Sequence, residues 1–329
     1  MAIASQTAYP DNSTELSKFL NSLQCTAEVH TVSDQALCDQ QHLHFCVLRD
    51  SLSEAQYTWA FGNKDPIWLD QLMDHSPDHT PEELYDLQRK HPPYGMFEPG
   101  PIMVENSGST SAKRRLPFSL NRWLKYVTPA SRGLKHYGVN SSDLLLTTDP
   151  GSTQAGYRTI EEAASWLCGT TVVPERSTSL TRKLETIRDY GITVFATNGQ
   201  KIERLLELDI EKYIQHSMKL IIITGTPTDL TQEIQDRFQC PVTEYYGSSE
   251  MGQTFYTCKH GQRHLNIDFV YPGEKQGKTV FSNISTLPIF NYVLGDELKY
   301  EWNGCCDCGS YLPVVTHFQT KNFSQIIKE

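Results

Sequence analysis

Residues 220–250, LIIITGTPTDLTQEIQDRFQCPVTEYYGSSE, contain one complete structural unit of this chain. Residues 220–224 are a continuous apolar run, which predicts a strand buried on both faces. Residues 230–238 have the spacing of a helix, and residues 242–245 read as a second strand. Two strands joined through one helix favour a parallel pair in a sheet that helices cover on both faces. Glycine and polar residues follow each strand, at the edge where α/β sheets bind ligands.

The same alternation extends upstream of this unit. We expect Pro129 to break or kink the helix that Ser119 begins. The predicted strands span residues 102–104, 144–147, 170–173 and 192–196, and the predicted helices residues 119–127, 159–168, 179–190 and 201–208. This pattern predicts an α/β fold with parallel sheets flanked by helices and a smaller β-rich subdomain near the C-terminus.

Residues 1–100 form an N-terminal α/β portion with weaker signals. A helix is predicted at residues 13–23 and a strand-like apolar stretch at residues 44–48. Acidic and histidine residues gather between positions 70 and 83, but Pro77 and Pro81 interrupt them, which favours a solvated loop over a metal site.

Composition narrows the classes of protein to which the chain can belong. The 329 residues are 38% hydrophobic, with a formal net charge of -10 and an isoelectric point near 5.6. This acidic balance argues against binding nucleic acid or an anionic membrane. No apolar run approaches the roughly 20 residues of a membrane span, and no signal peptide opens the sequence, so we expect a cytoplasmic protein.

A second polar segment, ENSGSTSAKRR at residues 105–115, has the composition of a phosphate-binding loop. Small hydroxyl residues and one glycine precede three cations, and such loops surround phosphate oxygens with backbone and hydroxyl donors. An ordinary surface loop can have the same composition, and the spaced glycines and the Gly-Lys-Ser/Thr ending of a Walker loop are missing. The residues predicted to contact phosphate are Ser107, Gly108, Ser109 and Thr110.

Four segments in order resemble the adenylate-forming superfamily of acyl-CoA synthetases, luciferases and peptide-synthetase adenylation domains, and especially its phenylacetate-CoA ligase-like branch. They are the loop just described, Thr224-Gly-Thr-Pro227, Glu244-Tyr-Tyr-Gly-Ser-Ser-Glu250 and Asn291-Tyr-Val-Leu-Gly-Asp296. Two of these segments directly follow predicted strands, as the ligand-binding edge of an α/β sheet requires. The resemblance implies that residues 101–250 are a nucleotide-binding core and residues 251–329 the β-rich subdomain.

The resemblance also implies roles for individual residues toward ATP or AMP. Tyr246 would lie against adenine, Ser249 would contact the α-phosphate, Glu250 would hold Mg²⁺ and Asp296 would accept both ribose hydroxyls. The remaining predicted nucleotide contacts are Gly225, Thr226, Pro227, Tyr245 and Gly247. Taken singly, the same residues also suit a helix cap at Ser248 or Ser249, a turn at Gly295-Asp296 and a core position for Tyr246.

The sequence departs from the family pattern in three places. Ser111 stands where the phosphate loop usually has glycine, and the loop's usual proline is absent. Either Lys113 or Arg114 therefore matches the loop's usual lysine, and both are candidate catalytic residues. Leu294 stands where the family usually has threonine. The chain also ends soon after Asp296, and we expect the family's small C-terminal domain, which supplies the adenylation lysine, to be absent. Lys321 and Lys328, near the end of the chain, are interpreted as solvated.

Cysteine and histidine residues follow the last two segments. Cys258 and His264 come after Glu250, and Cys306 and Cys308 come after Asp296. Three thiolates and one imidazole are a standard closed structural zinc site, and the resemblance implies one because some members of that branch carry such a site in corresponding places. Reduced cysteines in a turn-rich subdomain are the alternative, and Cys305 and His260 are competing ligands.

The expected activity is ATP-dependent activation of a small carboxylic acid as an acyl-adenylate, which CoA or a carrier-protein thiol would then capture. A partner protein would supply the missing lid. The alternative is a non-catalytic nucleotide or acyl-adenylate binding module in a biosynthetic complex. Aromatic residues near the site suggest an aryl or amino acid substrate, although each also suits the core. The expected pocket walls are Tyr157, Trp166, Phe195, Asn198 and Tyr245.

Overall fold

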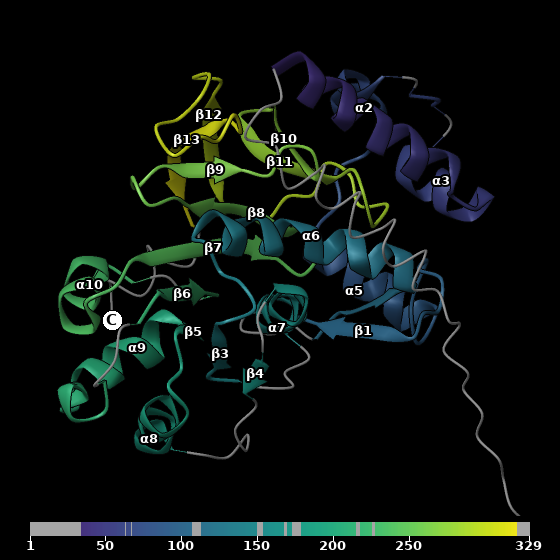
Figure 1. Ribbon diagram of the computed structural model, residues 1–329. Coiled ribbons are helices and arrows are strands. Elements are labelled where there is room, and N and C mark those ends of the chain that lie inside the picture. The colour runs from purple at the N-terminus through teal and green to yellow at the C-terminus, as the bar shows by residue number, and fades with distance from the viewer. Residues whose placement is uncertain are drawn as a thin grey trace, which may run out of the picture.

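A computed structural model describes residues 34–62, 64–66, 68–106, 113–149, 154–167, 170–172, 179–214, 218–225 and 228–320. Within these residues, nine strands form one sheet in the order β12-β13-β9-β8-β7-β6-β5-β3-β4 (Figure 1). The strands from β3 to β7 pair in parallel, and those from β7 to β12 pair antiparallel. None of the helices described here combines the length and the apolar character needed to cross a bilayer.

The parallel half of the sheet has the predicted helix-strand alternation. Its strands are β3 (Leu144–Thr147), β4 (Thr170–Val172), β5 (Val194–Thr197), β6 (Leu220–Thr224) and β7 (Val242–Ser248). The helices are α6 (Leu120–His136), α7 (Ala155–Leu167), α8 (Leu180–Tyr190), α9 (Gly199–Leu206) and α10 (Thr231–Phe238), with the 3-10 turn η3 (Ile210–Lys212) after α9. This arrangement confirms the predicted α/β class.

Successive residues of β6 face two different cores, as expected for a strand covered on both sides. Leu220 and Ile222 belong to the core that includes α6 and α7, and Ile221 and Ile223 belong to the core that includes α8, α9 and α10. All four side chains are almost fully buried. The sheet is therefore the middle layer of three, and its carboxyl ends are where the loops emerge.

The antiparallel half is the β-rich part of the chain. It contains β8 (Gly252–Thr257), β9 (Arg263–Leu265), β12 (Glu297–Glu301) and β13 (Val314–Gln319). Two hairpins lie outside the main sheet: β1 (Ile102–Glu105) with β2 (Arg115–Phe118), and β10 (Val270–Lys275) with β11 (Lys278–Asn283). The predicted β-rich subdomain is thus continuous with the parallel strands through the β7–β8 pair.

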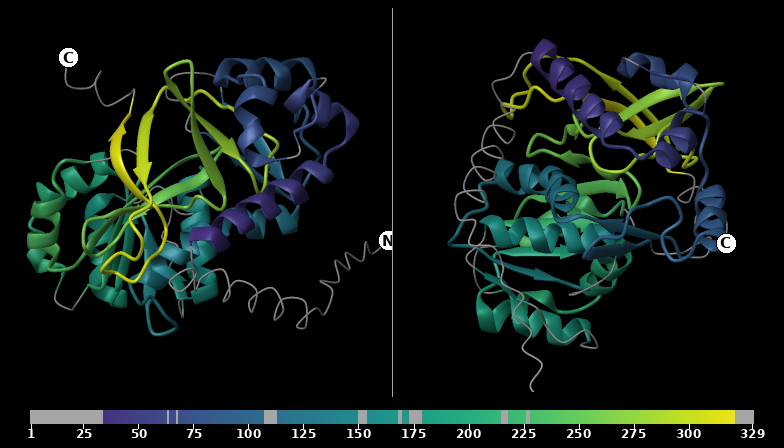
Figure 2. Two further views of the ribbon diagram at one scale, coloured as in Figure 1. Left: turned by 90° about the horizontal axis from the view of Figure 1, so that it is seen from above. Right: turned by 90° about the vertical axis from the view of Figure 1, so that its right-hand side faces the viewer.

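The N-terminal helices pack near the β10–β11 hairpin, at the end of the molecule away from α8–α10 (Figure 2). They are α2 (Asp34–Asp50), α3 (Glu54–Phe61), η2 (Leu69–Gln71) and α4 (Leu72–His75). Helix α5 (Pro81–Lys90) instead lies beside the β1–β2 hairpin, where Gln88 accepts a hydrogen bond from the Arg115 N–H at 3.0 Å (Figure 1). Phe45 and Leu48 of α2 share a core with Phe61, Ile284 and Phe290. The helix predicted at residues 13–23 lies outside the described residues.

Three local predictions were wrong. Residues 70–83 are not one solvated loop, because they contain η2, α4 and the start of α5, and Ser76 and His79 are buried. Residues 44–48 are not a strand but the second half of α2, whose buried positions Leu37, Gln41 and Phe45 have helical spacing while Leu43 and Val47 are exposed. Pro129 does not break α6, which Ser119 caps as expected. Every residue from 126 to 134 is buried, so packing against the sheet holds the helix together across the missing hydrogen bond.

Helix α6 passes close over β7 at Gly133. A Cβ atom added there would lie 2.3 Å from the hydroxyl oxygen of Tyr245, which donates a hydrogen bond to the Ala130 carbonyl at 3.1 Å. Alanine normally stabilises a helix relative to glycine, so the close contact reverses the expected sign at this position.

We therefore expect Gly133→Ala to lower the free energy of unfolding by about 1–3 kcal/mol, through overpacking against Tyr245. Urea denaturation followed by circular dichroism measures the change. Asn121→Ala, at an exposed position of the same helix, is the matched control and should shift stability by less than about 0.5 kcal/mol. Equal or greater stability of the Gly133 variant would contradict the packing of α6 on β7.

Candidate functional site

The carboxyl ends of β6 and β7 carry two of the predicted nucleotide segments. Gly225 follows β6 with φ +79°, in the left-handed region that favours glycine, and Tyr246 to Ser248 form the end of β7 before the turn at Ser249 and Glu250. Thr226 and Pro227 lie outside the described residues. Ser107, Gly108, Ser109, Thr110 and Ser111 lie outside them as well.

The β1–β2 hairpin brings the end of the predicted phosphate loop to this place. Asn106 donates its backbone N–H to the Arg114 carbonyl at 3.2 Å, and its side-chain oxygen accepts from the Arg114 N–H at 2.8 Å. The chain thus returns at Arg114 beside the point where it left. The Nε atom of Arg114 then contacts Oε1 of Glu250 at 2.7 Å, across a separation of 136 residues.

Lys113 and Arg114, either of which could match the lysine of the family's phosphate loop, have different surroundings. The Lys113 side chain is exposed, and its Nζ lies 3.7 Å from Glu105. Arg114 is buried, and its contact with Glu250 outweighs the effect of burial, so that its pKa is raised further. The resemblance matched either residue to the catalytic lysine; the structure separates them into a solvent-facing lysine and an internal arginine.

The surroundings of Glu250 do not fit a divalent metal. Its side chain is 2% exposed, and Arg114 contacts it directly. Burial first, and then the charge of Glu250, raise the pKa values of Tyr126 and Tyr292 well above their usual range, so neutral phenols lie nearby. A Mg²⁺ ion keeps several water ligands and needs an accessible carboxylate. The Mg²⁺ role implied for Glu250 therefore disagrees with this arrangement.

The turn that carries Glu250 is held from several directions. Tyr126 of α6 donates its hydroxyl to the Ser249 carbonyl at 2.8 Å, and Asn283 donates its amide to the Glu250 carbonyl at 2.9 Å. The Ser248 hydroxyl accepts from the Met251 N–H at 3.1 Å and stabilises a turn that leads into β8, so Ser248 is not the helix cap that was considered for it. The turn is therefore positioned before any ligand binds.

Tyr246 and Asp296 also meet at the end of β7. The Tyr246 hydroxyl donates a hydrogen bond to Oδ2 of Asp296, which stands directly before β12. Burial, and then the Asp296 carboxylate, raise the pKa of Tyr246 well above its usual value, so its phenol is neutral and acts as a donor. The ring stacks on Phe255 with centroids 4.9 Å apart and lies 4.3 Å from Phe318 in an edge arrangement.

Tyr245 points the opposite way and is part of the core. It is 5% exposed and bonded to α6, because neighbouring residues of a strand face opposite sides of the sheet. Among the other expected pocket walls, Phe195 is fully buried in the α8–α10 core, Asn198 caps α9, and Trp166 donates to Glu162 at 3.2 Å. Tyr157 is also buried, and its hydroxyl accepts from Thr148 at 3.2 Å.

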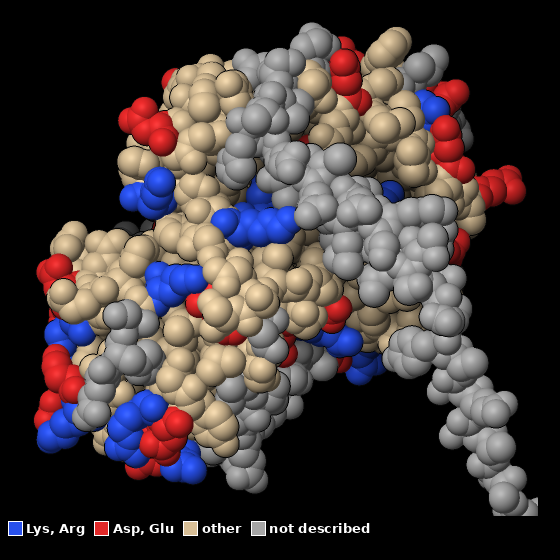
Figure 3. All heavy atoms as spheres, viewed as in Figure 1, with Lys and Arg blue, Asp and Glu red and all other residues tan. Residues whose placement is uncertain are grey.

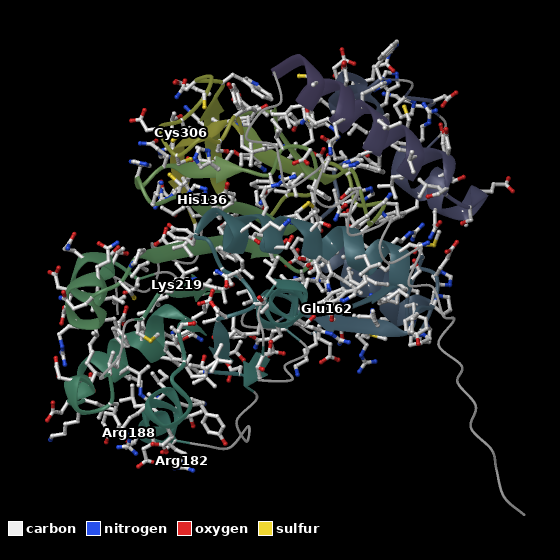
Figure 4. All side chains as sticks on the ribbon, in the orientation of Figure 1. His136, Glu162, Arg182, Arg188, Lys219 and Cys306 are labelled. Carbon is white, nitrogen blue, oxygen red and sulfur yellow. The ribbon has the colours of Figure 1, made fainter. Side chains whose placement is uncertain are left out.

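The four predicted zinc ligands come together in the antiparallel half. The ligand atoms of Cys258, His264, Cys306 and Cys308 all lie within 4.8 Å of one another. Figure 4 shows Cys306 in the region of β9 and β13. Cys305 and His260, the competing ligands, are both exposed. In a tetrahedral zinc site, Zn–S bonds of about 2.3 Å place sulfur atoms about 3.8 Å apart, so the donor set fits Zn²⁺.

Backbone groups fix the orientation of these ligands. The Nδ1 atom of His264 lies 3.2 Å from the Leu312 carbonyl, and Nε2 lies 3.1 Å from the Cys308 sulfur. An Nδ1–H that donates to a carbonyl leaves Nε2 free to bind a metal. Gly309, at φ +90°, closes the turn after Cys308, where its N–H donates to the Cys306 carbonyl at 2.7 Å. The hydrogen bond with Cys308 lowers the pKa of Cys258, which favours a thiolate there.

Two features of the site did not follow from the sequence. Arg114 was considered only as a substitute for a catalytic lysine, and nothing in the sequence indicated that it pairs with Glu250. Phe318 packs on Tyr246 because β13 joins β9 at the Val314–His264 pair. The spacing of the cysteines near β13 was the available signal, since a shared metal would have to bring these strands together.

Charge on the surface agrees with the acidic composition. On the face drawn in Figure 3, the basic side chains of the described residues are interspersed with acidic ones rather than gathered into one basic region. The clearest internal charges are instead two buried pairs, Arg114 with Glu250 and Arg132 with Asp268.

Comparison with solved structures identifies the fold. A 2-hydroxyisobutyryl-CoA ligase in an open conformation, in complex with 2-HIB-AMP and CoA, has a TM-score of 0.72 at 14% identity, over 86% of this chain and 73% of that chain. The same ligase in its thioesterification state has a TM-score of 0.66 at 14% identity, over 93% and 68%. ATP-bound MatB from Rhodopseudomonas palustris has a TM-score of 0.51 at 14% identity, over 70% of this chain and half of that chain.

The chain therefore has the fold of adenylate-forming ligases. No protein-family model matches the sequence, and no curated protein matches it closely enough to be significant. At 14% identity the likeness establishes the fold alone, and the activity has to be argued from the residues at the end of β7.

Proposed function

We propose that the protein activates a carboxylic acid with ATP, forming an acyl-adenylate and releasing pyrophosphate. The observation that carries this proposal is the convergence of three distant segments at the end of β7. Arg114 meets Glu250 across 136 residues, and Tyr246 meets Asp296 across 50 residues. These segments are the ones in which the sequence resembles adenylate-forming enzymes, and similarly folded ligases hold an acyl-AMP or ATP.

In this proposal, a carboxylate oxygen of the acid attacks the α-phosphorus, and the bond from phosphorus to the pyrophosphate oxygen breaks. Arg114 and the Ser249 hydroxyl would stabilise the developing charge, so the protein contributes positioning and fixed positive charge. The Asp296 carboxylate accepts the ribose hydroxyls, and Tyr246 supplies apolar ring area for adenine. Lys113, exposed beside the loop, remains available to a phosphate ligand.

The finer assignments extend the same proposal. An aryl or amino acid is the expected substrate class, and the thiol of CoA or of a carrier protein is the expected acceptor. The phenylacetate-CoA ligase-like branch is supported by the gathering of Cys258, His264, Cys306 and Cys308, which the resemblance implied.

One observation favours the second candidate function, a non-catalytic nucleotide or acyl-adenylate binding module. Glu250 is engaged by Arg114 and does not offer the open carboxylate expected for Mg²⁺. A site of this kind would retain an adenylate without turning over ATP. The two functions differ in a single measurable property, which is the exchange of pyrophosphate into ATP.

We expect carboxylate-dependent exchange of labelled pyrophosphate into ATP with at least one member of a panel of aryl and amino acids. Titration calorimetry with AMP measures nucleotide binding on the same sample. AMP binding without exchange would assign the protein to the binding module, and the absence of both would refute a nucleotide site at β7.

Asp296→Asn should weaken AMP binding by about tenfold or more, because hydrogen bonds to a charged acceptor contribute roughly 1.5–3 kcal/mol. Glu297→Gln is the matched control, since its side chain is exposed at the next position along the chain. Calorimetry of both variants makes the comparison. Equal affinities in the two variants would contradict the ribose role of Asp296.

We also propose that the Cys258, His264, Cys306 and Cys308 cluster holds a structural Zn²⁺ that joins the β8–β9 turn to the segment before β13. All four positions of a tetrahedral site are filled by protein, so the metal would clamp the two segments rather than catalyse a reaction. Because β13 carries Phe318, the clamp would also keep this ring against Tyr246.

The purified protein should contain about one zinc per chain by elemental analysis, as expected for one closed four-ligand site. Cys308→Ser should lose most of this zinc and unfold at a lower temperature, whereas Cys305→Ser, at the exposed neighbouring thiol, should keep both properties. Equal zinc content in the two variants would contradict the ligand assignment.

A further inference from the structure

The Arg114–Glu250 ion pair occupies a position where the resemblance implies a metal. Nε of Arg114 lies 2.7 Å from Oε1 of Glu250, and the two side chains are 8% and 2% exposed. A buried carboxylate needs a compensating charge, and a direct hydrogen-bonded guanidinium provides one. Arg114 of the chain itself thus supplies the positive charge that compensates the Glu250 carboxylate.

The groups packed around the carboxylate agree with this interpretation. Tyr126 and Tyr292 reach it from α6 and from the segment before β12, and burial followed by the charge of Glu250 keeps both phenols neutral. The Glu250 carbonyl is bound by Asn283. Among the described groups, the cation that contacts the carboxylate is Arg114, and Mg²⁺ with its water shell would have to displace it.

We propose that Arg114 is the resident cation of this site and takes the place of a divalent ion at Glu250. An arginine remains charged at all physiological pH values and offers donors in a fixed planar arrangement. Its positive charge stands at the end of the phosphate-loop segment without any metal bound. The nucleotide part of this inference rests on the proposed function, but the metal part does not.

The pair also positions the loop. Arg114 is the residue at which the chain re-enters the β1–β2 hairpin, next to Asn106. Its side chain joins this end of the hairpin to the turn after β7. The loop end and the Glu250 turn are therefore joined by one ion pair, and their separation does not depend on metal concentration.

Manganese binding tests the metal part directly. Mn²⁺ takes the same oxygen ligands as Mg²⁺, and the electron paramagnetic resonance signal of the free ion reports how much is bound. The unaltered protein, Glu250→Gln, Arg114→Gln and the double variant are each titrated with Mn²⁺ to millimolar concentration, without nucleotide. Any manganese at the cysteine cluster is common to all four proteins and cancels in the comparison.

We expect the unaltered protein and Glu250→Gln to bind the same amount of Mn²⁺. Arg114→Gln should gain a Mn²⁺ site that the double variant lacks, because removing the guanidinium exposes the carboxylate to the metal. A Glu250-dependent Mn²⁺ site in the unaltered protein would overturn the proposal. So would a folded Arg114→Gln that binds no more Mn²⁺ than the double variant.

Removing one partner of a buried pair can prevent folding. The comparison of the unaltered protein with the neutral double variant, which also lacks the Glu250 carboxylate, then still decides the question. A second readout is AMP affinity, which should be the same in buffer without added divalent cations and in Mg²⁺ for the unaltered protein and should fall by about tenfold in the double variant. A failure of the proposed function would abolish AMP binding in all four proteins but would leave the manganese result interpretable.

Discussion

Strand β7 forms hydrogen bonds with two neighbouring strands that run in opposite directions, and the rest of the site depends on this constraint. It pairs in parallel with β6 and antiparallel with β8, so the sheet changes its character at this strand. The carboxyl end of β7 therefore lies where loops of the parallel half meet strands of the antiparallel half. Tyr246, Ser249 and Glu250 stand at that junction because they follow directly from the strand that forms it.

Two buried ion pairs set the relative positions of the elements around the junction. Arg132 of α6 makes two hydrogen bonds to Asp268, at 2.8 and 2.9 Å, and joins the helix to the segment before β10. Arg114 joins the β1–β2 hairpin to the turn after β7. Buried pairs often add little net stability, but breaking one leaves an uncompensated charge, so they specify an arrangement. Here they define which segments face the proposed nucleotide.

The sequence was most informative where local pattern and burial agree. The bounds predicted for β6 match the structure, and Ser119, Ser179 and Gly191 act as the helix caps that their residue types predict. The four residues of the Cys/His cluster could be chosen from the sequence because a closed metal site needs residues in close pairs. The α2 helix was misread because a five-residue apolar window does not reveal the helical spacing of its longer segment.

The remaining features depend on contacts between distant residues. Nothing near Arg114 in the sequence indicates that it would reach Glu250, and the orientation of Tyr245 depends on which face of β7 α6 covers. Glu105 pairs with Arg115 across the β1–β2 hairpin, a register that the composition of the polar segment between them did not indicate.

The most direct test of the central claim is the location of bound adenine. Photolabelling with 8-azido-ATP, followed by mass spectrometry of the labelled peptides, identifies the residues next to the base. The account predicts a label on β7 or β13, near Tyr246 or Phe318, that excess AMP prevents. Labelling confined to other parts of the chain, or labelling that AMP does not reduce, would contradict a nucleotide site at the end of β7.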